Sequence, residues 1–208
     1  MSELQKSAMP HMIPLISGAD RELKSNIAMQ AVSSWVTMFT MVAEYAHVPT
    51  AAVGWEERIL FKNRRAPSEK WSVWIAPYDI HTASESFKAF NKSFHHWGLG
   101  FPAGSHCNTQ ITLCLAGGLL AVAFYSEHQY IVDLFQSFFP PELRLAHIHG
   151  THPTVSFPGG PINEAESLNI MTKLKKMLVD KLSMGVDVLD IHGAHPLFWN
   201  VANSRNRI

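Results

Sequence analysis

The stretch TQITLCLAGGLLAVAFY, residues 109–125, decides the fold class of this chain. Its two apolar runs, Thr109–Ala116 and Leu119–Tyr125, are typical of strands, and Gly117-Gly118 lies between them. A tight turn between antiparallel strands needs positive backbone angles, which glycine adopts without steric cost. The stretch therefore predicts a central β-hairpin.

A long N-terminal helix is predicted upstream of the hairpin. Between Asp20 and His47 apolar residues recur at helical spacing with polar residues between them, and Pro49 ends the pattern. The apolar positions are Ile27, Ala31, Trp35, Phe39 and Val42. Such spacing predicts a largely buried helix. We expect residues 1–18, which precede it, to be a loosely held tail.

The segment between this helix and the hairpin is expected to hold a strand followed by a second helix. Residues Trp71–Ala76 alternate as a strand does. The stretch Thr82-Ala-Ser-Glu85 has the pattern of a capping box, which predicts a helix from about Ala83 to His96. The stripe of this helix that should face the core consists of Phe87, Phe90 and Phe94.

The last third of the chain predicts a strand, helix, strand unit, after a short helix over His128–Phe139 that Pro140-Pro141 ends. Leu143–Ile148 and Val186–Ile191 are the strands, and Asn163–Leu182 is the helix. The inward residues of this helix should be Ile170, Leu174, Met177 and Leu178. A right-handed crossover would set the two strands parallel, with their C-terminal ends on the sheet edge where open α/β sheets bind ligands.

The composition favours one folded domain and gives no bulk charge to attract a partner. With 208 residues, 47% of them hydrophobic, the chain can close one sizeable core. We expect a single domain over residues 19–208, of the α/β or α+β class with a mixed sheet. The 17 acidic and 17 basic side chains balance, which argues against binding to nucleic acid or to an anionic membrane.

A cytoplasmic location is expected. The first residues lack the apolar core of a signal peptide. Cys107 and Cys114 should lie on opposite faces of an extended stretch, which argues against a disulfide between them. A catalytic thiol at Cys107 is the alternative to an ordinary loop cysteine. Polar residues in Ile27–Ala43, and the shortness and glycines of Ile111–Tyr125, mark both apolar segments as core elements rather than membrane spans.

Histidine triplets at predicted strand ends are the unusual chemical feature of the sequence. The stretch Ile148-His-Gly-Thr-His-Pro153 matches Ile191-His-Gly-Ala-His-Pro196 in five of six positions. Three triplets share one pattern: Asp79-Ile-His81, His147-Ile-His149 and Asp190-Ile-His192. Residues two apart on an extended chain share a face, so each triplet should direct two polar groups to one side.

If the three strands are neighbours, these triplets converge on one cavity. Its side chains would be Asp79, His81, His147, His149, Asp190 and His192. Such a set suits zinc, or manganese or iron where carboxylate and water ligands dominate. A bound metal with an open position would make a hydrolytic nucleophile from water, and a spare histidine or aspartate could act as general base. This predicts a metal-dependent hydrolase or lyase for a small polar substrate, with His149 and His192 as catalytic groups and His152 and His195 above them.

Three other interpretations stay open. The histidines can be hydrogen-bonded core or turn residues, or the relic of a duplicated structural unit. A non-catalytic module that binds a small ligand in the same strand-edge pocket, or that forms a homo-oligomer through its apolar surface, fits the same pattern. Metal-free phosphodiester chemistry would use His149 and His192 as acid and base.

Two short resemblances accompany the triplets. The run His147–His152 resembles the His-x-His-x-Asp-His signature of metallo-β-lactamase-fold hydrolases, with Thr151 in the place of the aspartate. Too little of the chain follows it to supply that family's remaining ligands. The stretch His149-Gly-Thr151 resembles the His-x-Ser/Thr motif of two-histidine phosphoesterases, but His192-Gly-Ala194 lacks the second hydroxyl. Neither resemblance covers more than a few residues, so no family is assigned.

Overall fold

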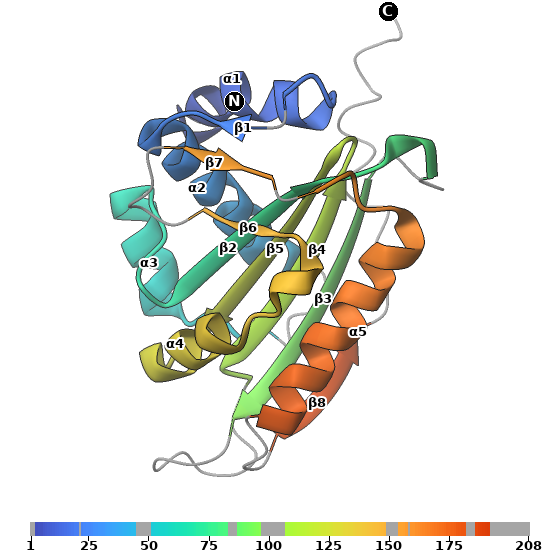
Figure 1. The fold of residues 1–208 in the computed structure, drawn as a ribbon. Helices are drawn as coiled ribbons and strands as arrows, with labels where there is room; N and C mark the ends of the chain where they lie inside the picture. Colours follow the sequence, from blue (N-terminus) through green and yellow to red (C-terminus); the bar gives the residue numbers. More distant parts are fainter. Residues whose placement is uncertain are drawn as a thin grey trace, which may run out of the picture.

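The computed structural model describes residues 3–20, 22–44, 51–82, 87–96, 107–148, 154–157, 159–181 and 186–191, and for residues 91–96, 181 and 186–191 it describes the backbone only. Helices and strands are interspersed along these ranges (Figure 1). The α-helices are α1 (Glu3–Ile16), α2 (Asn26–Ala43), α3 (Trp55–Arg64), α4 (Gln129–Phe138) and α5 (Glu164–Lys181). Short 3-10 turns are η2 (Ile80–Thr82) and η3 (Pro141–Leu143).

The main sheet of the described residues has six strands in the order β6-β2-β5-β4-β3-β8, and each neighbouring pair is antiparallel. Its strands are β2 (Trp71–Pro77), β3 (Phe87–His96), β4 (Thr109–Ala116), β5 (Leu119–Ser126), β6 (Ala146–His147) and β8 (Val186–Ile191). A small second sheet pairs β1 (Glu22–Leu23) with β7 (Val155–Ser156). The predicted α/β or α+β class is confirmed. A mixed sheet was expected, whereas all described strand pairs of the main sheet are antiparallel.

Helices cover both faces of the main sheet. In Figure 1, α2 lies behind the sheet, and α4 and α5 lie in front of it. Along β2, Val73 and Ile75 join a buried cluster with residues of α1 and α2, the α1/α2 core. Trp74 and Ala76 join a second cluster with residues of α4 and α5, the α4/α5 core. Burial on both faces explains why the hairpin strands are continuous apolar runs.

The predicted hairpin is confirmed as β4 and β5, and its turn has a second structural role. Gly117 has a positive φ of 53°, in the region that favours glycine. The N–H of Gly118 donates to the carbonyl oxygen of Ile16 at 2.6 Å, so the turn meets the end of α1. A Cβ on Gly117 would lie 2.5 Å from that same oxygen. The two glycines are therefore required by close approach as well as by turn geometry.

The predicted tail over residues 1–18 differs from the structure, in which residues 3–16 form α1. Ala8, Met12 and Leu15 are at most 2% exposed and lie in the α1/α2 core. Pro10 and Pro14 lie inside the helix, which weakens the local helical signal. The apolar face of α1 becomes evident only when α2 and the hairpin turn are present to cover it.

The predicted helix from Ala83 to His96 is wrong, because Phe87–His96 form β3, paired with β4. Phe87 packs against the α1/α2 core and Phe90 against the α4/α5 core. Residues an odd number apart face opposite sides in a strand, and the two phenylalanines follow that rule. Residues 83–86, which hold most of the expected capping box, lie outside the described residues.

The expected parallel strand, helix, strand unit is also wrong. β6 pairs with β2 at one edge of the sheet, and β8 pairs with β3 at the other. Because every intervening pair is antiparallel, β6 and β8 run in opposite directions. Pairing with β2 or with β3 joins residues far apart in the chain, and local strand and helix patterns do not encode which edge a strand joins. The α5 prediction holds, since Ile170, Leu174 and Leu178 are buried in the α4/α5 core and Met177 packs against it.

The long N-terminal helix is confirmed as α2, and its buried face agrees with the expected one only in part. Ile27 is 75% exposed and Val42 is 40% exposed. Ala31, Trp35 and Phe39 pack against the α1/α2 core as expected, while Met29, Val32 and Val36 hold its fully buried positions. Apolar residues surround most of α2, so the spacing alone could not choose the face. In the described part of the chain, no helix combines the length and apolarity that a membrane crossing requires.

Candidate functional site

Asp79 and His81 lie in a turn after β2. One carboxylate oxygen of Asp79 accepts the backbone N–H of His81 at 3.0 Å, and the hydroxyl of Thr82 donates to the carbonyl oxygen of Asp79 at 2.9 Å. The backbone N–H of Asp79 donates to Ile162 at 2.8 Å. This is the local hydrogen bonding by which aspartate stabilises turns. The His81 side chain is exposed.

His147 lies on β6 opposite Trp74. Its ring centroid is 4.8 Å from that of Trp74, and the ring planes are tilted by 32°. Phe139 stacks on the same indole at 4.3 Å. His147 is therefore one ring of an aromatic cluster at the edge of the α4/α5 core.

Of the predicted site residues that the structure describes, His147 and Asp190 lie far apart across the sheet. β6 and β8 are the two edge strands of a six-stranded sheet, so five inter-strand steps of about 4.8 Å place His147 and Asp190 about 24 Å apart. Asp190 is also displaced from Asp79 along the strand direction. The backbone of Asp190 lies in the same cross-strand row as Ser72, near the start of β2. Asp79 follows the end of β2, about 20 Å from that row along the strand. The row runs through Lys92, Ile111 and Phe124.

His147 pairs with Trp74, five residues before Asp79, so Asp79 lies about 17 Å further along the chain. Asp79, His147 and Asp190 are thus separated from one another. The other predicted positions, His149, His152, His192 and His195, lie outside the described residues. Within the described ranges, no three histidine, cysteine, aspartate or glutamate side chains are grouped so that they could hold a metal ion.

Several partly buried polar residues lie around the start of α5, beside the turn that contains Asp79. Lys88 of β3 forms an ion pair with Glu164, and the backbone N–H of Glu164 donates to the Thr82 hydroxyl at 3.3 Å. Burial, followed by the charge of Glu164, raises the pKa of Tyr78. The hydroxyl of Ser167 donates to the carbonyl oxygen of Glu164 at 2.7 Å. These groups partner one another and dock α5 on β2 and β3.

Both cysteines are buried and free of disulfides, as predicted. Burial, and next the charge of Glu44, raise the pKa of Cys107. Burial raises the pKa of Cys114 to about 12. Because the thiolate is the nucleophile, these environments oppose a catalytic thiol at either position.

Two buried glutamates hold α3 in place. Glu44, 1% exposed, accepts the backbone N–H groups of Ala52 and Val53 at 2.9 and 3.1 Å and forms an ion pair with Arg58. Burial is the largest influence on Glu44 and raises its pKa. Glu57, 4% exposed, accepts hydrogen bonds from nearby side chains. Their donors are the Ser68 hydroxyl at 2.7 Å and the Trp71 indole at 3.0 Å.

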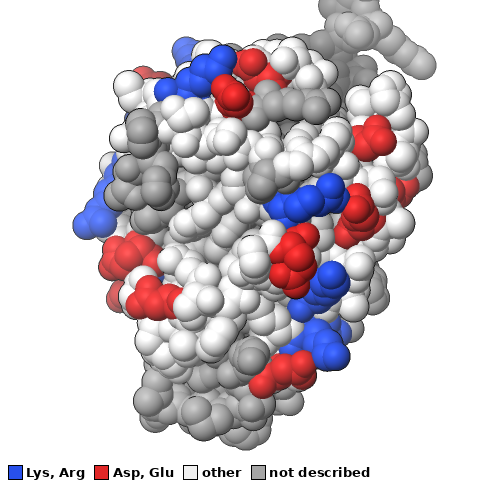
Figure 2. Space-filling view, in the orientation of Figure 1, with Lys and Arg blue, Asp and Glu red and all other residues white. Residues whose placement is uncertain are grey.

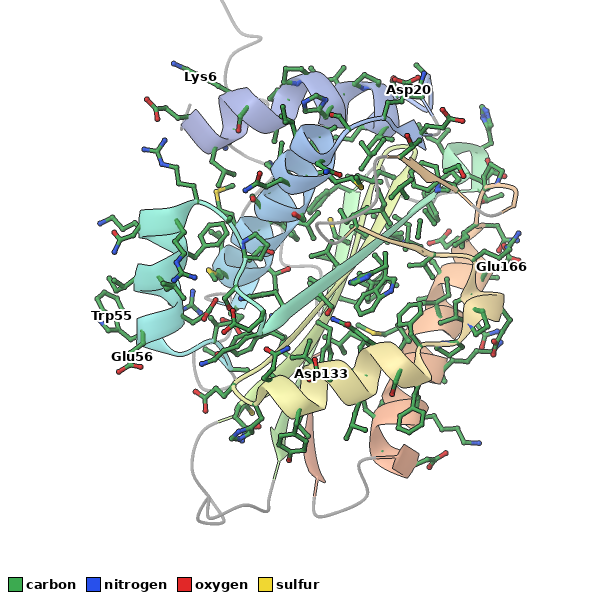
Figure 3. The ribbon with its side chains drawn as sticks, turned by 60° about the vertical axis from the view of Figure 1, so that its left-hand side comes forward. Lys6, Asp20, Trp55, Glu56, Asp133 and Glu166 are labelled. Atoms are coloured by element: carbon green, nitrogen blue, oxygen red, sulfur yellow. The ribbon has the colours of Figure 1, made fainter. Side chains whose placement is uncertain are left out.

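A pocket opens where α1, α2 and the end of α3 meet. Its volume is about 360 Å³. The lining residues are Glu3, Leu4, Ser7, Ile27, Gln30, Ala31, Ser34 and Arg65. In Figure 3 the N-terminal part of α1, marked by Lys6, lies above α3, marked by Trp55 and Glu56, and α2 passes beside both. We call this cavity the α1–α2 pocket.

Charge and an unpaired hydroxyl characterise the α1–α2 pocket. Arg65 follows α3 with a positive φ of 55°, and its backbone N–H donates to Phe61 at 2.7 Å. Its guanidinium forms an ion pair with Glu3, and the hydrogen bond in this pair holds the pKa of Glu3 below its usual value. Ser34 is 3% exposed, and its hydroxyl has no hydrogen-bond partner among the described residues.

Sequence reasoning missed this pocket because it treated the α1 residues as a tail. Glu3, Leu4 and Ser7 supply one wall, and without α1 that wall does not exist. The available signal was Ser33-Ser34, an adjacent pair of polar residues within the apolar stretch of the predicted helix. Ser33 donates to Gln30 at 3.1 Å, whereas Ser34 has no such bond.

The face of the molecule drawn in Figure 2 shows no charged patch that would mark a second candidate site. On the face drawn in Figure 2, acidic and basic side chains are interspersed, with no broad field of one sign. No family model matches the sequence, and no curated protein or solved structure is significantly similar to it. The α1–α2 pocket is therefore assigned as the candidate site on its own geometry.

Proposed function

We propose that the protein binds a small organic molecule in the α1–α2 pocket. The observation that carries this proposal is the Ser34 hydroxyl, which is buried on the wall of a cavity and lacks a partner in the described chain. A buried hydroxyl left without a hydrogen bond costs about 1–3 kcal/mol. A ligand that donates to or accepts from Ser34 would recover this free energy.

The size and lining of the pocket also support a small ligand. Its volume of about 360 Å³ falls near the lower end of the range of small-molecule sites, roughly 300–1,000 Å³. Leu4, Ile27 and Ala31 provide apolar contact, while Gln30 and Ser34 provide hydrogen-bonding groups. Ligand sites commonly combine an apolar lining with a few polar groups that orient the ligand.

The lining favours binding over catalysis. Among the described residues, the lining contains neither histidine nor cysteine. A serine nucleophile needs an adjacent base, and the one lining carboxylate, Glu3, has a lowered pKa, which makes it a poor proton acceptor. Ser7, which also lines the pocket, donates its hydroxyl hydrogen to the carbonyl oxygen of Leu4 at 2.9 Å, so this hydroxyl is already engaged.

The proposal is tested by titrating ¹⁵N-labelled protein with isopropanol, a probe with one hydroxyl and a small apolar part. We expect saturable shifts of the amides of Leu4, Ile27, Ala31 and Ser34. Ser34→Leu, which fills the pocket wall, should abolish them. Ser137→Leu, at an exposed serine of α4, is the matched control and should not. Shifts that persist in Ser34→Leu, or no saturable shifts in the parent, would overturn the proposal.

The metal-dependent hydrolase or lyase stays a prediction, favoured by the repeated hexapeptides at 148–153 and 191–196. Metal-free phosphodiester chemistry at His149 and His192, a homo-oligomer and a cytoplasmic location are predictions as well. Elemental analysis of the parent and of a folded His149→Ala/His192→Ala variant separates the first two. Stoichiometric zinc, manganese or iron that the variant loses would support the metal site, and its absence after incubation with these ions would exclude it.

A further inference from the structure

We infer that the ligand of the α1–α2 pocket is a zwitterion of the amino-acid type, with its carboxylate on Arg65 and its ammonium on Glu3. This inference rests on the proposed function and names the ligand class for the same site. The two charged residues of the lining, Glu3 and Arg65, have opposite signs and come from different parts of the fold.

The ion pair selects against ligands of a single charge. An anion drawn to Arg65 meets the negative charge of Glu3, and a cation drawn to Glu3 meets Arg65. A molecule that carries both charges can satisfy both residues at once. The Arg65 guanidinium suits the carboxylate end, because its fork of N–H groups matches two carboxylate oxygens.

Opening the ion pair to admit such a ligand is easy. The side chains of Arg65 and Glu3 are 59% and 73% exposed, so water already solvates both charges. Exposed ion pairs contribute little to stability. The ligand would then exchange one exposed ion pair for two ionic contacts, one with each of the same side chains.

The remaining lining matches the body of an amino acid. Leu4, Ile27 and Ala31 can contact an aliphatic side chain. The backbone N–H of Arg65 donates to the carbonyl oxygen of Phe61, which fixes the backbone at the end of α3 from which the guanidinium extends. An aliphatic amino acid is accordingly the simplest ligand with all of these features.

Four related probes test the inference by calorimetry and by amide shifts. They are L-leucine, L-leucinamide, N-acetyl-L-leucine and N-acetyl-L-leucinamide, which carry both charges, only the cation, only the anion, and neither. We expect leucine to bind most tightly, and loss of either charge to weaken binding about tenfold. Equal affinity for all four probes would overturn the inference.

Protein variants locate the two charges. Arg65→Gln and Glu3→Gln should each weaken leucine binding about tenfold and leave N-acetyl-L-leucinamide unaffected. The exchanged variant Glu3→Arg/Arg65→Glu should recover part of the leucine affinity, because leucine can bind with its carboxylate and ammonium in exchanged positions. Arg144→Gln is the matched control, since Arg144 also has a positive φ, of 59°, and pairs with Glu166 at 2.8 Å on another part of the fold.

The outcomes separate this inference from the proposed function. If isopropanol shifts the pocket amides in a Ser34-dependent way and leucine does not bind, the pocket is a ligand site but not for zwitterions. If isopropanol also fails, both proposals are overturned. Leucine affinity that Arg65→Gln and Arg144→Gln reduce equally would likewise contradict the assignment to Arg65.

Discussion

The buried ion pair of Glu44 and Arg58 shows how single residues set local structure here. Glu44 closes the end of α2 and binds the backbone of the segment that leads into α3. Arg58 also donates to the carbonyl oxygens of Met41 and Val53, at 2.9 and 3.1 Å. Removing one partner of such a pair leaves the other charge buried and uncompensated.

Arg58→Met is expected to lower the free energy of unfolding by about 3 kcal/mol, measured by urea titration. Burial raises the pKa of Glu44 in the folded state, so the folded state binds its proton more tightly than the unfolded state does. The stability from this group is present below the unfolded pKa and is lost as pH rises through the folded pKa. Without Arg58, which lowers that pKa, the loss should be larger, so the variant's deficit should grow from about pH 4.5 to neutral pH.

Arg65→Gln is the control for this comparison, because its ion pair is exposed, and its unfolding midpoint should stay close to that of the parent. If Arg58→Met lowers the free energy of unfolding equally at about pH 4.5 and at neutral pH, Glu44 does not titrate in this range.

The two thiols give a second prediction for single residues. Since burial raises the pKa of both, and that of Cys114 to about 12, they should be protonated near pH 8. We expect neither to react with Ellman's reagent in the folded protein, and both to react in urea. Fast reaction of one thiol in the folded state would place it in an open, thiolate-stabilising environment.

The hairpin turn and α1 illustrate coupling between elements. The β4–β5 turn meets the last carbonyl group of α1, and α1 in turn supplies one wall of the α1–α2 pocket. A change at the turn should therefore reach the pocket through the position of α1.

Gly117→Ala should destabilise the protein by about 1–3 kcal/mol, because alanine is strained at a φ of 53° and its Cβ would lie 2.5 Å from the Ile16 oxygen. Amide hydrogen exchange in α1 should rise more than exchange in α5, because the turn is hydrogen-bonded to the end of α1. Gly160→Ala is the control, since nothing lies within 4 Å of a Cβ there. Unchanged exchange in α1 would show that the turn does not hold this helix.

The order of strands is a property of the whole molecule. Pairs distant in sequence, such as Trp74 with His147 and Lys92 with Asp190, define the two edges of the sheet. Nuclear Overhauser effects should connect each of these pairs along the backbone. None should connect residues 146–147 with residues 186–191, because the remaining strands lie between them. Contacts between those two segments would restore the parallel unit and with it the convergence of the histidine triplets.

The parts of the fold that depend on neighbours in sequence were predictable. The hairpin follows from two apolar runs around Gly117-Gly118, and α5 follows from the spacing of Ile170, Leu174 and Leu178. These signals are local, because turn angles and helical periodicity are set within a few residues. The pattern of Phe87, Phe90 and Phe94 fits a helix as well as a strand, and only pairing with β4 resolved it.

The candidate site was decided by tertiary structure. The sequence alone could identify polar residues such as Ser34 and the histidine triplets, but not which of them come together. Strand order separated His147 from Asp190, and the docking of α1 brought Glu3 to Arg65 and Ser34. Which edge a strand joins, and which helix face is covered, depend on the free energy of burying surfaces that are far apart in the chain, and no local pattern encodes that choice.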